Sequence, residues 1–139
     1  MPKDIATRLR QAIQNEEKRA SKRLQSLDES ARLAEQKFEP VKQAAVDLQH
    51  ELAAVPGIEV TVNPDSVWIT LADRELRFSY NLGSQRFVGE EAVHSWYDGE
   101  AYSELYEWDK PDACIESLIR LCAKYVRMAN AISRQTGAA

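Results

Sequence analysis

Glycine and proline are almost absent from the first part of the chain. Between residues 4 and 55 there is no glycine, and Pro40 is the only proline. Alanine, glutamine, glutamate, lysine, arginine and leucine dominate there, and all of these favour helix. We predict one long amphipathic helix over residues 1–55, kinked near Pro40 because proline removes a backbone donor and clashes with the preceding turn. The alternative is two helices, the second beginning at Pro40.

Long apolar runs are also missing. Charged side chains interrupt every apolar segment, so no stretch reaches the roughly 18 to 20 residues that a membrane-spanning helix needs. The N-terminal segment has no apolar core of the kind that secretory signals contain. From these two absences we expect a cytoplasmic protein without a membrane span.

Cysteine and histidine are scarce. The chain has two cysteines, Cys114 and Cys122, and two histidines, His50 and His94. If one helix carries both cysteines, they are about 12 Å apart along its axis, which is too far for a disulfide bond. There is no metal-ligand spacing, glycine-rich phosphate loop or serine-hydrolase motif. We therefore expect reduced structural cysteines, no metal, no cofactor and no enzymatic activity.

The apolar residues of the predicted long helix repeat every seven positions. From Ala20 onward they follow one another in alternating steps of four and three, which is the spacing of a coiled-coil seam. Before Ala20 the repeat weakens, because Glu17 occupies the next seam position and only Ile5, Leu9 and Ile13 remain as a short stripe. The predicted oligomer seam consists of Leu24, Leu27, Ala31, Ala34, Phe38, Val41, Leu48 and Leu52.

The length of this helix indicates a partner. A helix of about 50 residues is about 75 Å long, whereas a compact body formed by the remaining residues is only about 30 Å across. That body can cover only part of the seam. We expect a homodimer, parallel or antiparallel. The alternatives are a helix from another protein, or a fold-back within the same chain.

After Pro56 and Gly57 the apolar period changes to two, which is typical of half-buried strands. Short alternating runs separated by turn residues predict an antiparallel sheet of four to six strands over residues 58–108. An apolar stripe over residues 110–134 predicts a final helix that packs on one face of this sheet. The predicted fold class is therefore α+β, with a helical domain 1–55 and a small α+β domain 56–139.

Charge is distributed unevenly along the chain. Residues 1–23 carry seven bases and three acids, whereas residues 90–116 carry nine acids and one base. The acidic segment also contains aromatic residues, which supply contact area at interfaces, while carboxylates attract a basic partner. The predicted partner-binding residues are Trp96, Asp98, Glu100, Tyr102, Glu104, Tyr106 and Trp108. The alternative interpretation is that the aromatic rings fill the core and the acids keep an edge strand soluble.

These patterns favour a non-enzymatic, self-associating protein-interaction module of the adaptor, chaperone or inhibitor type. Its partner would be a protein, basic in character, that binds the acidic and aromatic surface. The alternative is a nucleic-acid-associated protein that uses the basic turns of the N-terminal helix. Arg8, Lys18, Arg19, Lys22 and Arg23 would then contact phosphates.

Overall fold

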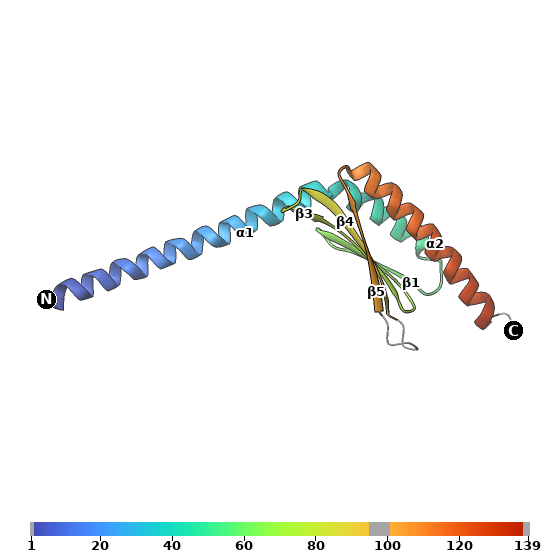
Figure 1. Cartoon of the computed structure of the whole chain (residues 1–139), viewed down its shortest axis with the longest axis horizontal. Helices are drawn as coiled ribbons and strands as arrows, with labels where there is room; N and C mark the ends of the chain where they lie inside the picture. The colour runs from blue at the N-terminus through green and yellow to red at the C-terminus, as the bar shows by residue number, and fades with distance from the viewer. Residues whose placement is uncertain (1, 95–100, 138–139) are drawn as a thin grey trace. The chain divides into compact units, whose positions relative to one another are not determined.

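The computed structural model describes residues 2–94 and 101–137, with side chains described for residues 4–94 and 103–135. Along the chain, the strands follow a long first helix and precede a second helix (Figure 1). In chain order the elements are α1 (Pro2–Leu52), β1 (Ile58–Val62), β2 (Ser66–Leu71), β3 (Arg74–Asn81), β4 (Arg86–His94), β5 (Ala101–Trp108) and α2 (Pro111–Gly137). This arrangement confirms the predicted α+β class, with its long N-terminal helix, antiparallel sheet and C-terminal helix.

Helix α1 is continuous through Pro40. The two-helix alternative therefore does not occur, and neither does a fold-back of this segment on itself. The helix ends at Leu52, where the amide of Val55 donates a hydrogen bond to the Leu52 carbonyl at 3.0 Å. Gly57 then adopts a positive φ of 88°, a conformation that side chains with a Cβ rarely adopt. This glycine allows the chain to turn from α1 into β1.

The chain divides into two compact units, residues 1–33 and residues 34–139. Every residue of the first unit whose side chain is described is exposed. In the second unit, the remainder of α1 contributes Phe38, Val41 and Ala45 to the hydrophobic core, where all three are buried. The second half of α1 thus belongs to the same packed unit as the sheet and α2.

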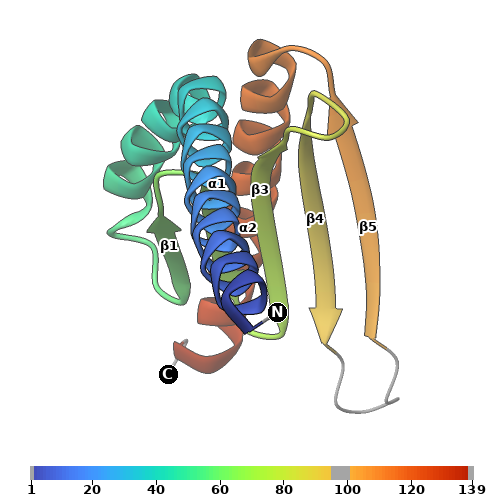
Figure 2. The same ribbon diagram turned by 90° about the vertical axis from the view of Figure 1, so that its left-hand side faces the viewer.

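The strands form one antiparallel sheet in the order β1-β2-β3-β4-β5 within the described residues. Figure 2 shows β3, β4 and β5 side by side, with β5 at the edge. The connection from β2 to β3 is tight, and Ala72 has a positive φ of 53° there. At the other edge, the Gln49 side chain of α1 donates a hydrogen bond from Nε2 to the Val60 carbonyl of β1 at 2.8 Å.

One face of the sheet is covered by the second half of α1 and by α2. Alternate residues of the strands point to this face, so their side chains enter a shared core. Ile69, Leu76 and Phe78 from the sheet are buried there together with Leu118 and Tyr125 of α2. The C-terminal helix therefore packs on one face of the sheet, as predicted.

Gly89 of β4 leaves space for the Trp108 indole. A Cβ placed on Gly89 would lie 2.7 Å from Cη2 and 2.9 Å from Cζ3 of Trp108, and 3.1 Å from Cε1 of Phe78. The Trp108 ring stacks on Phe78, with a centroid separation of 5.8 Å. Even one methyl group at position 89 must therefore displace an aromatic ring of the core.

We predict that Gly89→Ala lowers the free energy of unfolding by about 1 to 3 kcal/mol, because an added methyl group overpacks a filled site. Urea titration followed by circular dichroism measures this loss. Gly83→Ala is the matched control, because its Cβ would meet only the flexible Asn81 side chain, at 3.2 Å. Equal losses for the two variants would contradict the explanation based on the Trp108 contact.

Candidate interaction surfaces

The first half of α1 carries apolar side chains that are exposed among the described residues. Ile5, Leu9, Ile13, Leu24 and Leu27 are between 50% and 68% exposed. They share a stripe because they follow one another at close to the 3.6-residue period of a helix, apart from the interruption by Glu16 and Glu17. Large apolar side chains arranged in a continuous stripe favour a binding partner more strongly than scattered ones do.

The predicted seam is divided between two environments. Leu24, Leu27 and Ala31 are exposed, and Ala34 is half-buried. Farther along the helix Phe38, Val41 and Leu52 are buried, and Leu48 is half-buried against the same core. The protein's own sheet and α2 therefore cover the later seam residues, whereas the earlier ones remain accessible.

The predicted acidic and aromatic residues are described only in part. Trp96, Asp98 and Glu100 lie outside the described residues, and Tyr102 is placed only by its strand pairing with Val93. The strand alternation puts Glu104, Tyr106 and Trp108 on one face of β5, and this is the face that the helices cover. Trp108 is half-buried and packs against the hydrophobic core, while Glu104 is exposed.

A polar cluster joins this edge of the sheet to α2. Glu91 of β4 is only 2% exposed, and the Lys124 Nζ of α2 donates hydrogen bonds to both of its carboxylate oxygens, at 3.1 and 3.3 Å. Glu91 lies directly opposite Glu104 of β5, whose Oε2 accepts a hydrogen bond from the Tyr106 hydroxyl at 2.5 Å. Lys124 thus neutralises a buried carboxylate, which would otherwise be costly to desolvate.

The same cluster changes the ionisation of Tyr106. The hydrogen bond to Glu104, together with burial and the negative charge of that carboxylate, raises the pKa of Tyr106 to about 12. The phenol is therefore neutral at physiological pH and donates a hydrogen bond to Glu104. The alternation of side chains along β4 could have identified Glu91 as an inward-facing acid, because Glu91 shares its parity with Phe87 and Val93, which are both buried.

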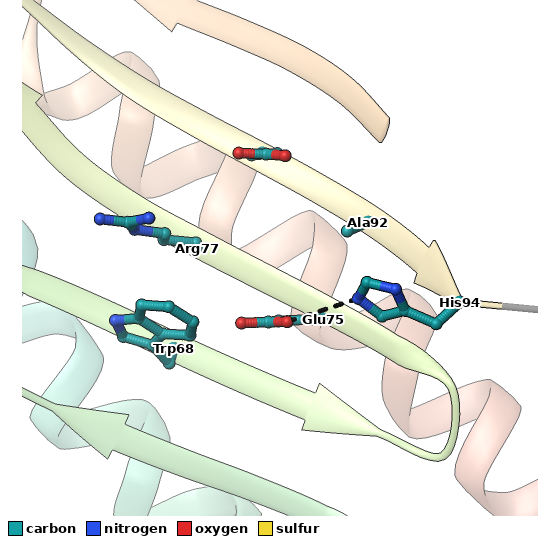
Figure 3. Close-up of a pocket in the computed structure, with 6 residues that line it drawn as sticks. Trp68, Glu75, Arg77, Ala92 and His94 are labelled. Carbon is teal, nitrogen blue, oxygen red and sulfur yellow. Dashed lines mark ion pairs between the residues drawn. The ribbon is translucent and has the colours of Figure 1, made fainter. Parts of the chain in front are cut away.

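The opposite face of the sheet bears a shallow hollow of about 230 Å³, lined by Trp68, Glu75, Arg77, Glu90, Ala92 and His94. Figure 3 shows its labelled side chains on the near side of the sheet, with the helices behind. The Arg77 guanidinium carbon lies 4.8 Å from the centroid of the Trp68 ring, a cation–π contact. His94 Nε2 lies 3.7 Å from Glu75 Oε2. No helix described here covers this hollow.

A second hollow of about 190 Å³ adjoins the first and shares Arg77 and Glu90 with it. It is also lined by Leu105 of edge strand β5, which is 75% exposed. We use the name open sheet face for this surface, defined by the outward side chains Glu59, Trp68, Glu75, Arg77, Arg86, Glu90, His94, Leu105 and Glu107. Its carboxylates outnumber its arginines, one of which, Arg86, pairs with Glu107 at 2.7 Å, and the face also carries the exposed Leu105 and the half-buried Trp68.

Trp68 and its neighbours were not among the predicted partner-binding residues. The signal for them was the alternation of β2, in which Trp68 and Thr70 occupy outward positions between the buried Val67, Ile69 and Leu71. An outward tryptophan is unusual on a solvated sheet face, because burial of its large ring is favourable. That parity could have marked the open sheet face before the structure was known.

Among the described residues, no cluster of three or more histidine, cysteine or acidic side chains could hold a metal ion. Likewise, no described helix is both long enough and apolar enough to cross a membrane.

Comparisons with protein-family models, with curated protein sequences and with solved structures gave no significant match to this chain.

The basic N-terminal residues of the nucleic-acid alternative are solvent-exposed on α1. Arg8, Lys18, Lys22 and Arg23 are exposed, and the Arg19 Nη1 pairs with the Glu16 Oε1 at 3.2 Å. An exposed ion pair of this kind is worth at most about 1 kcal/mol, so it does not hold either side chain rigidly. Contact with phosphates stays a prediction.

Both cysteines are buried free thiols in α2. Burial raises the pKa of Cys114 and of Cys122 to about 12, so the reactive thiolate is scarce near neutral pH.

We predict that a maleimide reagent at pH 7.5 modifies neither cysteine in the folded protein and modifies both in denaturant. Intact-mass spectrometry counts the adducts, and rapid modification of the native chain would contradict this account.

Proposed function

We propose that this protein is a non-catalytic interaction module that self-associates through the first half of α1 and presents the open sheet face to a basic protein segment. The observation that carries the proposal is the exposed apolar stripe from Ile5 to Leu27. A helix of this length gains most of its stability from packing of its apolar face, because isolated helices are marginal in water. An uncovered stripe therefore calls for a partner.

A second copy of the chain is the partner that best fits the stripe. Every copy carries the same surface, and two-fold association of identical surfaces is the commonest form of protein oligomer. Residues 5–34 offer a contact strip about 45 Å long and about 10 Å wide, or about 900 Å² over two copies. That area is close to the roughly 1,000 Å² of the smaller specific interfaces. Each large apolar side chain buried there contributes about 1.5 to 3 kcal/mol.

We predict that the protein at tens of micromolar has twice its monomer mass of 15.8 kDa. Replacing two exposed leucines with charged residues, in Leu24→Glu plus Leu27→Glu, should give a monomer, because burial of glutamate in a seam is unfavourable. Light scattering after size-exclusion chromatography measures both masses.

Leu33→Glu is the matched control for this experiment. Leu33 is also exposed, at 45%, but it lies outside the seven-residue seam. This variant should remain a dimer. A wild-type monomer at the same concentration would defeat the proposed self-association, and so would equal dissociation of the control.

The open sheet face supports the second part of the proposal. Glu59, Glu75 and Glu90 lie there with Arg77 and a histidine, whereas Glu107 pairs with Arg86 at 2.7 Å, so the acids exceed the bases and the surface attracts positive charge. Trp68 already stacks on the Arg77 guanidinium, and an aromatic face of this kind also suits a partner's arginine. A lysine- and arginine-rich segment is therefore the chemistry that fits this face.

We predict that Glu75→Gln plus Glu90→Gln weakens the binding of a fluorescent basic peptide about 5- to 20-fold at low salt, because two attractive charges are lost. The probe is a peptide of about 12 residues that alternates lysine, arginine and glycine, and its anisotropy is read at about 20 mM and about 300 mM salt. Higher salt should reduce the difference between the wild type and the variant.

The matched control removes the same charge elsewhere, in Asp47→Asn plus Glu51→Gln on the exposed side of α1. Equal weakening by the control would show that only net charge matters, and would contradict a site on the open sheet face.

A further variant, with Asp98, Glu100 and Glu104 replaced by serine, tests the acidic and aromatic surface that was predicted from the sequence. Weakening by this variant alone would move the docking site there.

A further inference from the structure

Two charged residues lie within the apolar stripe that we propose as the self-association surface. In the seven-residue frame that contains Leu24 and Leu27, the preceding seam positions are Arg10, Ile13, Glu17 and Ala20. Arg10 and Glu17 therefore point toward the same partner helix as the leucines. Their presence makes the parallel and the antiparallel orientation of a dimer unequal in free energy.

A parallel dimer in register brings identical residues together at every layer of the seam. Arg10 would then face the partner's Arg10, and Glu17 would face the partner's Glu17. Like charges in direct opposition are unfavourable, and the partly desolvated seam screens them less than bulk water does. No opposite charge occupies a neighbouring seam position to compensate either pair.

An antiparallel dimer removes both conflicts. One register sets Ile13 against the partner's Leu24, and the two-fold axis repeats that contact at the other end of the overlap. In the same register Arg10 faces the partner's Leu27, over which its aliphatic stem can lie while its guanidinium reaches water. Glu17 faces the partner's Ala20, whose small side chain leaves room for the glutamate stem.

The flanking charges also form ion pairs in the same register. Glu16 and Arg23 both lie beside the seam on its same side. In the antiparallel arrangement Glu16 approaches the partner's Arg23, and the symmetry makes this pair twice. Within one helix, Glu16 pairs with Arg19 at 3.2 Å between exposed side chains. An exposed pair of this kind is weak, so Glu16 can leave Arg19 and pair with the partner's Arg23 instead.

We infer that two copies of the chain pair as an antiparallel coiled coil over residues 6–31 of α1, with Ile13 packed against the partner's Leu24. This inference rests on the proposed self-association and adds its orientation and register. The overlap places Ile13, Leu24 and Leu27 in the seam and Leu9 beside it, whereas Ile5 lies beyond its end.

Cysteine cross-linking tests the register. The double variant Ile13→Cys plus Leu24→Cys should form disulfide-linked dimers on mild oxidation, whereas each single variant should form few. A mixture of the two single variants should yield cross-linked heterodimers. Peptide mass spectrometry of the oxidised sample identifies which positions are joined. Efficient cross-linking of the Ile13→Cys variant to itself would instead show a parallel pair and overturn the inference.

Spin labels outside the seam test the orientation without removing any apolar contact. Labels on Ser30→Cys should be about 35 Å apart in the antiparallel dimer and only about 10 to 20 Å apart in a parallel one. Labels on Ser21→Cys lie close to the two-fold axis, so the distance between them should be short in both the antiparallel and the parallel dimer. The parent protein without an introduced cysteine serves as the labelling control, because its own cysteines are buried.

The possible results separate the two proposals. A monomeric wild type removes the self-association and this inference together. A dimer with a short Ser30 distance overturns the antiparallel orientation alone. A dimer with a long Ser30 distance but no link between positions 13 and 24 overturns the register.

Discussion

Burial of the second half of α1 against the sheet is the contact on which the rest of the structure depends. Phe38 and Val41 are fully buried, and with Ala45 they fill the space between the sheet and α2. This packing fixes the helical conformation from residue 34 onward, and the continuous hydrogen bonding of the helix extends it toward the N-terminus. The exposed stripe is thus an extension of a helix that the core already stabilises, which reduces the cost of nucleating it.

The sheet divides polar and apolar side chains between its two faces, and two exceptions on the covered face show how this division is maintained. Glu91 is an acid in the core, and Lys124 reaches from α2 to neutralise it. Gly89 is a strand residue without a side chain, and the Trp108 ring occupies the space that a side chain would fill. The first contact ties α2 to β4, and the second ties edge strand β5 to the centre of the sheet.

The larger features of this fold could be predicted because each follows from a local rule. The change of apolar period after Gly57 marked the passage from helix to sheet, and the stripe from Ile115 to Ile132 marked the final helix. The division of the seam could not be predicted in this way. Leu27 and Val41 occupy equivalent positions of the same repeat, yet one is exposed and the other buried. Only the three-dimensional packing decides which seam residues the chain covers itself.

The candidate site shows the same limit. Strand alternation correctly grouped Glu104, Tyr106 and Trp108 on one face of their strand, but it could not say which face the helices would cover. That choice depends on the pairing of all the strands with α2. Alternation marks Trp68, Glu75 and Glu90 as residues of one parity within their own strands, but only the pairing of three different strands brings them together on the open sheet face.

The hydrogen bond from Gln49 to the Val60 carbonyl has a consequence for how the molecule behaves at high concentration. Unpaired backbone groups at a sheet edge invite strands from other molecules to add, which leads to aggregation. At β1 a side chain from α1 already occupies one such acceptor. At the other edge of the sheet, β5 carries the exposed Glu104 carboxylate and the ion pair of Glu107 with Arg86, and charged side chains on an edge strand oppose pairing with another strand. Both edges of the sheet thus oppose the addition of strands from other molecules.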